Sequence, residues 1–275
     1  MGTFPPIDDR LRALGRRLLR RHPRWESGLL RARDGYARAY VRLRWLANRL
    51  RYDAPPAPYR LLEVDPAAIE RIVPVPGPKF TNAGADVGGD WDRTDRRFEE
   101  TDVFRAYERH FEDGVPWQAT EFYDRVVREI ESGQPRWGCR SRHEFDERCE
   151  RLDRLYERIA AEGYRTQPEI RADGGSDPIE GDRDTENGRE LKTEQFKHEV
   201  AVNVARDGEV RFADGRNRLS IAKLLDLDTV PVRVLRRHRR WQAVRDAATR
   251  GDPIPPEHSS HPDIAGLDRN DREST

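Results

Sequence analysis

The chain has 275 residues, with 51 basic and 51 acidic side chains and a mean hydropathy of −0.97. This length fits one large domain or two ordinary ones, and zero net charge argues against a wholly basic nucleic-acid coat protein. No run approaches the ~18 apolar residues of a transmembrane helix. The N-terminus MGTFPPIDDR lacks the apolar core of a signal peptide, so we expect a cytoplasmic location. Cys139 and Cys149 are too few for a disulfide framework or a structural zinc site, and we expect reduced thiols.

Residues 1–52 predict basic amphipathic helices. Apolar residues recur at helical spacing in two sets, one from Leu11 to Leu19 and one from Leu29 to Leu50. The segment holds 14 Arg and four acidic residues, a local charge of 14 − 4 = +10. Such helices can dock on an anionic membrane or contact nucleic-acid phosphates. The alternative is a helical pair packed on the domain with a solvated arginine face.

Residues 53–171 predict a mainly helical region. The expected elements are a short strand at 59–64 and three helices, at 102–112, at 119–132 and from Ser141 to Gly163. Ser141 and Glu144 form a capping-box pattern at the start of the third helix. Cys149 falls on the apolar stripe of that helix, which supports a buried thiol.

Residues 74–98 predict a long irregular loop, rich in Gly, Pro and Asp, of a kind that is often functional. Within it, Asp90 and Asp92 flank Trp91. Their carboxylates could reach a metal ion or a substrate hydroxyl, or could serve as caps and turn formers.

The C-terminal third predicts a small α/β module at 193–249, preceded by a flexible acidic linker at 172–192 and followed by a disordered tail at 250–275. The module's expected elements are strands at 199–204, 209–213 and 229–235, helices at 219–227 and 238–249, and a hairpin turn at Asp207-Gly208. The predicted fold class is therefore α+β, a helix-rich N-terminal region plus a small C-terminal α/β module.

A strand-to-helix turn at Asp214-Gly215 carries the clearest chemistry. The free N–H groups and the dipole of a helix start attract an anion, and Gly215 lets the backbone approach a phosphate. Arg216 and Arg218 add guanidinium donors suited to phosphate oxygens. Asn217 could contact a base or sugar, and Asp214 could hold Mg²⁺ or accept a proton. The alternative is a tight turn with surface arginines.

Several segments of the module resemble the ParB/sulfiredoxin-like fold: 198–204, Asp207-Gly208, the Gly-x-x-Arg box from Gly215 to Arg218, and 231–234. The resemblance covers roughly residues 196–245 and implies that the box binds nucleotide phosphates. CTP-binding ParB proteins, sulfiredoxins and free serine kinases share this fold. The whole chain, with GGDWD at 88–92 and WGCRSR at 137–142, is also similar to an uncharacterised prokaryotic family with a DGRHRL-type box.

The box departs from these families at one position. Asn217 stands where sulfiredoxins carry a reactive Cys and where the related prokaryotic proteins usually carry His. Sulfiredoxin chemistry and a catalytic histidine there are therefore not expected. ParB proteins continue into a helix-turn-helix domain, whereas only a short helix and a polar tail follow residue 235, which argues against DNA partitioning.

Two further groups flank the box. Glu199, beside His198, could act as a general base on a hydroxyl, as phosphoryl transfer requires, or could be a strand-end surface group. The basic run 236–240, which includes Arg237 and His238, could extend a phosphate site or contact a nucleic-acid backbone, or could be solvated.

Three functions follow from these patterns. The first is a nucleotide-binding enzyme, a small-molecule kinase or nucleotide hydrolase, using ATP, ADP or CTP with Mg²⁺, with Asp214 and Glu199 as catalytic groups. The second is a nucleic-acid-binding or nuclease-like ParB-domain protein, although no zinc finger or helix-turn-helix pattern is present. The third is a peripheral membrane protein. For the first, we expect Trp91 and Asp92 to line a cleft near Arg218.

Overall fold

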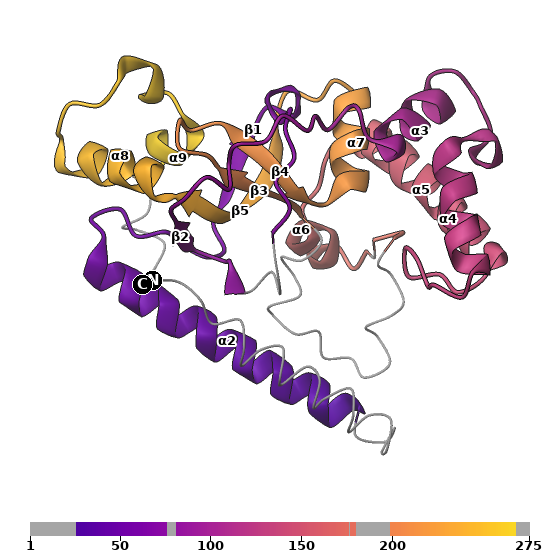
Figure 1. The fold of residues 1–275 in the computed structure, drawn as a ribbon, viewed down its shortest axis with the longest axis horizontal. Helices are drawn as coiled ribbons and strands as arrows, with labels where there is room; N and C mark the ends of the chain where they lie inside the picture. Colours follow the sequence, from indigo (N-terminus) through magenta and orange to yellow (C-terminus); the bar gives the residue numbers. More distant parts are fainter. Residues whose placement is uncertain (1–25, 76–80, 176, 180–198, 268–275) are drawn as a thin grey trace.

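The computed structural model describes residues 26–75, 81–175, 177–179 and 199–267 (Figure 1). Its centre is a five-stranded mixed sheet in which β1, β5, β3 and β4 follow one another and β2 also pairs with β5. The strands are β1 (Leu61–Val64), β2 (Ala85–Val87), β3 (Val200–Val204), β4 (Val210–Asp214) and β5 (Val230–His238).

Strand β5 organises the sheet because its nine residues have room for two partners on one side. Antiparallel β1 pairs with its first half and parallel β2 with its second half. Strand β3 runs parallel to β5 along the other side, and β4 returns antiparallel to β3. The described strands therefore confirm the α+β class.

Helices surround this sheet (Figure 1). They are α2 (Glu26–Arg51), α3 (Asp102–Phe111), α4 (Glu121–Glu131), α5 (Arg142–Glu162), α6 (Gln167–Ala172), α7 (Arg216–Leu224), α8 (Arg239–Arg250) and α9 (Pro262–Ala265), with 3₁₀ turns η2 (Pro66–Ala68), η4 (Trp117–Ala119) and η6 (Pro256–His258). Helices α3, α4 and α5 gather at one end, beside α7, whereas α8 and α9 lie at the other end.

Helix α7 joins two apolar cores. Its residues Leu219 and Ala222 belong to the core on one face of the sheet, whereas Ile221 belongs to the core inside α3, α4 and α5. Burial of these side chains on two sides fixes α7 relative to both parts. The turn that precedes α7 is therefore held by tertiary packing.

Local sequence signals explain the helix ends. The hydroxyls of Thr101, Thr120 and Ser141 each accept a hydrogen bond from a backbone N–H at 3.2 Å, as N-caps do. Gly163 ends α5 at φ 77°, a left-handed conformation that suits glycine. Cys149 is buried and reduced, as its place on the stripe predicts.

The sheet does not follow the predicted division into an N-terminal helical region and a C-terminal module. Strands β1 and β2 come from the region predicted as mainly helical, yet both pair with β5. Strand β1 falls within the predicted 59–64 strand. Strand β2 lies in the loop predicted as irregular, and its three residues are too few to show an alternating pattern.

The predicted linker and tail are partly ordered. Asp177 is 5% exposed and pairs with Arg218, so residues 177–179 of the predicted 172–192 linker are held in the fold, whereas 176 and 180–192 lie outside the described residues. In the predicted tail, η6 and α9 form, and Asp263 is completely buried. A polar sequence gave no sign of this because ion pairing, not apolar area, holds Asp263.

Helix α2 packs on the body of the protein through one side. Ala37 and Val41 are buried, and Asn48 Nδ2 donates to the Gly84 carbonyl at 2.8 Å. Arg44 Nη1 donates to the Thr81 carbonyl at 2.7 Å. The helix predicted around Leu11 to Leu19 lies outside the described residues. Within the described part of the chain, no helix has the length and apolar character needed to cross a membrane.

Candidate phosphate site at the start of helix α7

Gly215 shapes the turn between β4 and α7. It lies at φ 86° and ψ 34°, a left-handed conformation, and is the N-cap of α7 without a side-chain capping bond. A Cβ atom there would lie 2.8 Å from Val200 Cα and 3.1 Å from the Glu199 carbonyl oxygen. Both the dihedral angle and the close approach of β3 therefore require glycine.

Arg218, the last residue of the predicted box, points into the protein. Its side chain is 5% exposed and forms an ion pair with Asp177. It also donates to the Arg165 carbonyl at 3.2 Å, and its guanidinium lies 5.2 Å from the centre of the Tyr164 ring. Burial raises the pKa of Asp177 and the Arg218 charge lowers it, with a net downward direction. Arg218 therefore has its counter-charge within the chain.

Glu199 belongs to the same buried network. One carboxylate oxygen accepts a hydrogen bond from the Gln167 backbone N–H at 2.6 Å, and the other accepts one from the Tyr164 hydroxyl at 3.1 Å. Its side chain is completely buried. Burial raises the pKa of Glu199, and Arg218 opposes that shift. In this geometry Glu199 positions its neighbours, and its role as a general base stays a prediction.

The network was only half visible in the sequence. Glu199 and Arg218 are brought together, as expected for residues of one site. Their partners Tyr164, Gln167 and Asp177 were missed because they lie in segments without a periodic pattern. Gln167 Nε2 donates to Asp177 at 2.7 Å, and the Gln167 backbone N–H donates to Glu199, so one residue links the two carboxylates.

The outer residues of the box, Arg216 and Asn217, are more exposed than Arg218. Arg216 is exposed, and its guanidinium lies 5.5 Å from the centre of the Trp137 ring. Asn217 is half-buried, and its Oδ1 is shielded from solvent and has no hydrogen-bond partner among the described residues. Asp214, also half-buried, ends β4 opposite Ala201. Asp214, Arg216 and Asn217 thus flank Gly215 at the start of α7.

Asp90, Trp91 and Asp92 lie elsewhere, contrary to the prediction that Asp92 approaches Arg218. Asp92 is 2% exposed and accepts hydrogen bonds from Arg206, including Nε at 2.8 Å and Nη2 at 2.6 Å, and these hold its pKa well below the usual range. Asp90 accepts from the same Nη2 at 2.8 Å. Arg206 follows the end of β3, whereas the Arg218 network lies at the start of the same strand. The five residues of β3, at ~3.3 Å each, therefore place about 16 Å of strand between Asp92 and this network.

The basic run 236–240 spans the end of β5 and the start of α8, and its first three residues are buried. Arg237 is buried and forms two hydrogen bonds to Asp263, at 2.7 and 2.6 Å. His238 caps α8 by accepting from the Arg240 N–H at 3.1 Å and contacts the Gly89 carbonyl at 2.9 Å. The structure does not bring these side chains to the α7 turn, and His198 lies outside the described residues.

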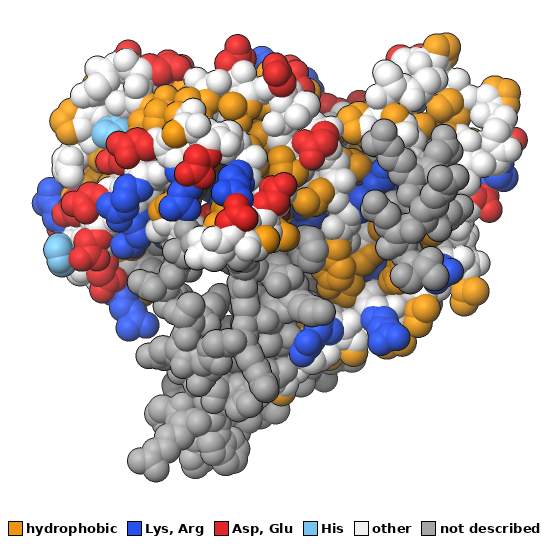
Figure 2. Space-filling model, turned by 180° about the vertical axis from the view of Figure 1, so that it is seen from behind, with side chains coloured by type: hydrophobic (Ala, Val, Ile, Leu, Met, Phe, Trp, Pro, Cys, Tyr) orange, Lys and Arg blue, Asp and Glu red, His pale blue; other side chains and the backbone are white. Residues whose placement is uncertain are grey.

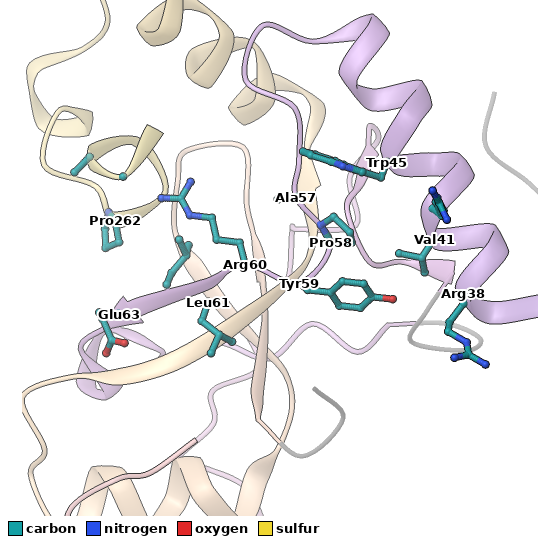
Figure 3. A pocket seen from close by; sticks show the side chains of 14 residues that line it. Arg38, Val41, Trp45, Ala57, Pro58, Tyr59, Arg60, Leu61, Glu63 and Pro262 are labelled. Atoms are coloured by element: carbon teal, nitrogen blue, oxygen red, sulfur yellow. The ribbon is translucent and has the colours of Figure 1, made fainter. Parts of the chain in front are cut away.

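Two other features bear on ligands. Among the described residues, no group of three or more His, Cys, Asp or Glu side chains is arranged to hold a metal ion. A cavity of about 980 Å³ lies between α2, β1 and α9, away from α7 (Figure 3). It is lined by Arg38, Val41, Arg42, Trp45, residues 57–63, Pro262, Ala265 and Gly266.

No protein-family model matches this chain, and neither a curated protein nor a solved structure matches it. The resemblance to the ParB/sulfiredoxin-like fold therefore stays a prediction.

Proposed function

We propose that this chain binds a phosphorylated small molecule, a nucleotide, at the turn between β4 and α7. The observation that carries the proposal is the start of α7, which has no side-chain cap and presents the exposed Arg216 and the half-buried Asn217 at its first turn. Backbone N–H groups and the helix dipole at such a start favour phosphate oxygens. Arg216 would add a charged, planar donor.

The buried network of Glu199, Arg218, Asp177 and Gln167 would support the turn between β4 and α7 from inside the protein. Arg218 and Glu199 tie the first turn of α7 to the start of β3 and to α6. Nucleotides are the proposed ligands, as ATP, ADP or CTP with Mg²⁺. Asp214 and phosphate oxygens would hold the metal ion, which would neutralise phosphate charge. More specifically, the protein would act as a kinase or a nucleotide hydrolase.

Calorimetric titration with ATP, ADP and CTP, each with Mg²⁺, tests this proposal. Wild type should bind at least one of them, and Arg216→Gln should bind it about tenfold or more weakly, because a hydrogen bond to a charged group contributes about 1.5–3 kcal/mol. Arg93→Gln is the matched control, since its side chain is 70% exposed and pairs with Asp90. Absence of binding by wild type, or equal affinity of wild type and Arg216→Gln, would contradict the proposal.

A second candidate function, docking on an anionic membrane, is favoured by one observation. The large apolar side chains that are exposed in the described part of the chain all lie on α2: Tyr36 (37%), Leu43 (67%), Leu46 (47%) and Leu50 (91%). Their spacing of seven, three and four residues places them on one side of the helix, with arginines along it. A nucleic-acid backbone would use the arginines but would leave the leucines unexplained.

Co-sedimentation with vesicles tests the membrane candidate. Full chain should sediment with vesicles of phosphatidylglycerol and phosphatidylcholine but not with phosphatidylcholine alone, since binding combines apolar burial with electrostatic attraction. The double variant Leu43→Gln, Leu50→Gln should lose most of this binding.

On the face drawn in Figure 2, acidic and basic side chains are interspersed over the lobe of α3, α4 and α5, which does not suit a nucleic-acid surface. Both candidates suit a cytoplasmic protein that is peripheral to the membrane.

A further inference from the structure

The cavity between α2 and β1 has the size and the walls of a small-molecule site. Its volume of about 980 Å³ lies within the range of about 300–1,000 Å³ that organic ligands occupy. Trp45 reaches from α2 and Tyr59 from the segment that leads into β1, so aromatic rings line the space from opposite walls (Figure 3). Val41 and Leu61 add aliphatic surface. A flat ring system would pack well in such a space.

The wall of this cavity carries excess positive charge. Among the described residues that line it, Arg38, Arg42 and Arg60 stand against one carboxylate, that of Glu63, which gives 3 − 1 = +2. Figure 3 shows Arg60 and Glu63 on the side of β1 and Arg38 on the side of α2. The cavity therefore favours a ligand that carries negative charge as well as rings.

Arg60 has no ion pair of its own among the described residues. Its Nη1 is buried without a hydrogen-bond partner among the described residues, and burial lowers its pKa. The carboxylate of Asp263 is near, but Arg237 donates to both of its oxygens, at 2.6 and 2.7 Å. Trp241 Nε1 donates to one of them at 2.9 Å, and Arg245 lies within 3.3 Å. The buried carboxylate of Asp263 thus pairs with Arg237 and Arg245, and Arg60 forms no ion pair with it.

Arg233 adds to the imbalance behind the cavity wall. It pairs with Leu61 across β1 and β5, is 4% exposed, and has no partner for Nε and Nη2 among the described residues. Burial lowers its pKa to about 10, against the opposing effects of Tyr59 and Glu199. Arg237, by contrast, has a buried aspartate partner. A buried charge without a partner is costly, and an anion bound beside Arg60 would offset part of the excess positive charge in this region.

We propose that this cavity binds an organic anion with a flat ring system, whose rings pack against Trp45 and Tyr59 and whose carboxylate, phosphate or sulfonate group binds Arg60. This site is separate from the α7 turn and goes beyond the proposed function. Gly266 positions Arg60, because a Cβ atom at Gly266 would lie 1.9 Å from Arg60 Nη2. Gly266 has φ −98°, which alanine accepts, so Gly266→Ala would displace the end of the arginine side chain without backbone strain.

A pair of fluorescent probes tests the proposal on the full chain. 1-Anilinonaphthalene-8-sulfonate carries the rings and the charge, whereas N-phenyl-1-naphthylamine carries the same rings without charge. Wild type should bind the sulfonate at least tenfold more tightly than the amine, because charge-assisted hydrogen bonds select the anion. Arg60→Gln and Gly266→Ala should each weaken sulfonate binding about tenfold and leave amine binding unchanged. Arg93→Gln should match wild type with both probes.

Three results would overturn the proposal. They are no sulfonate binding by wild type, equal affinities of wild type for the two probes, and sulfonate binding by both site variants that equals wild type. Near-ultraviolet circular dichroism shows whether Arg60→Gln folds. If it does not fold, the result with Gly266→Ala tests the proposal, since the backbone at position 266 accommodates alanine. Arg216→Gln should leave sulfonate binding unchanged, which separates this site from the α7 turn.

Discussion

Removing the Asp177 carboxylate tests the network beneath the α7 turn most directly. Asp177 is 5% exposed and pairs with Arg218, which is equally buried. The variant Asp177→Ala would remove the ion pair of the buried Arg218 guanidinium. Among the described residues, Arg218 would keep its hydrogen bond to the Arg165 carbonyl and the more distant charge of Glu199. Loss of a buried ion-pair partner is expected to destabilise the fold strongly.

The magnitude follows from the type of contact. Breaking a buried ion pair by deleting one partner costs about 3–5 kcal/mol. Asp177 also accepts from Gln167 Nε2 and from the Ile179 N–H, so we expect a loss of about 4 kcal/mol. Replacing both partners, as in Asp177→Ala with Arg218→Met, should cost much less than the two single changes together, because neither member of the ion pair is then buried alone. Glu199 keeps its hydrogen bonds from Gln167 and Tyr164.

Urea denaturation of the full chain, followed by circular dichroism and tryptophan fluorescence, gives the free energies of unfolding. The two single variants and the double variant complete a cycle. A cost below about 1 kcal/mol for Asp177→Ala, with additive effects in the double variant, would refute the buried network. Residues 177–179 would then behave as part of the flexible linker that the composition of this segment indicates.

Three further predictions follow from single positions. Gly215→Ala should destabilise the protein by about 2–5 kcal/mol, because alanine there meets both a backbone clash and the cost of a left-handed dihedral angle. Gly114→Ala is the control: Gly114 also has a positive φ, 69°, but open space around it, so only the dihedral cost of about 1–2 kcal/mol is expected. Urea midpoints compare the two. Burial raises the pKa of Cys149 to about 12, so iodoacetamide at pH 8 should modify it only after unfolding, as mass spectrometry would show. Asp263 has a pKa well below its unfolded value of about 3.9 because Arg237 and Arg245 outweigh burial, so its contribution to stability is complete above that pH and lost as the pH falls. Asp263→Asn should flatten the dependence of the melting temperature between pH 5 and 2.

Local order was accessible from the sequence. The N-caps, the end of α5 at Gly163 and the strands β3, β4 and β5 depend on residues within a few positions of one another, so periodicity and capping patterns predict them. The turn at Gly215 belongs to this group, since a strand, a glycine and a helix follow directly along the chain.

Partner choice was decided by the tertiary structure. Arg218 pairs with Asp177, 41 residues away, and Asp92 pairs with Arg206, 114 residues away. In a chain with 51 acidic and 51 basic side chains, no local pattern selects these pairs. Burial does so, because folding removes particular charges from water together and leaves others exposed. The sequence thus determined which residues form the α7 turn, and the tertiary structure decided that Arg218 supports the turn from within while Arg216 faces outward.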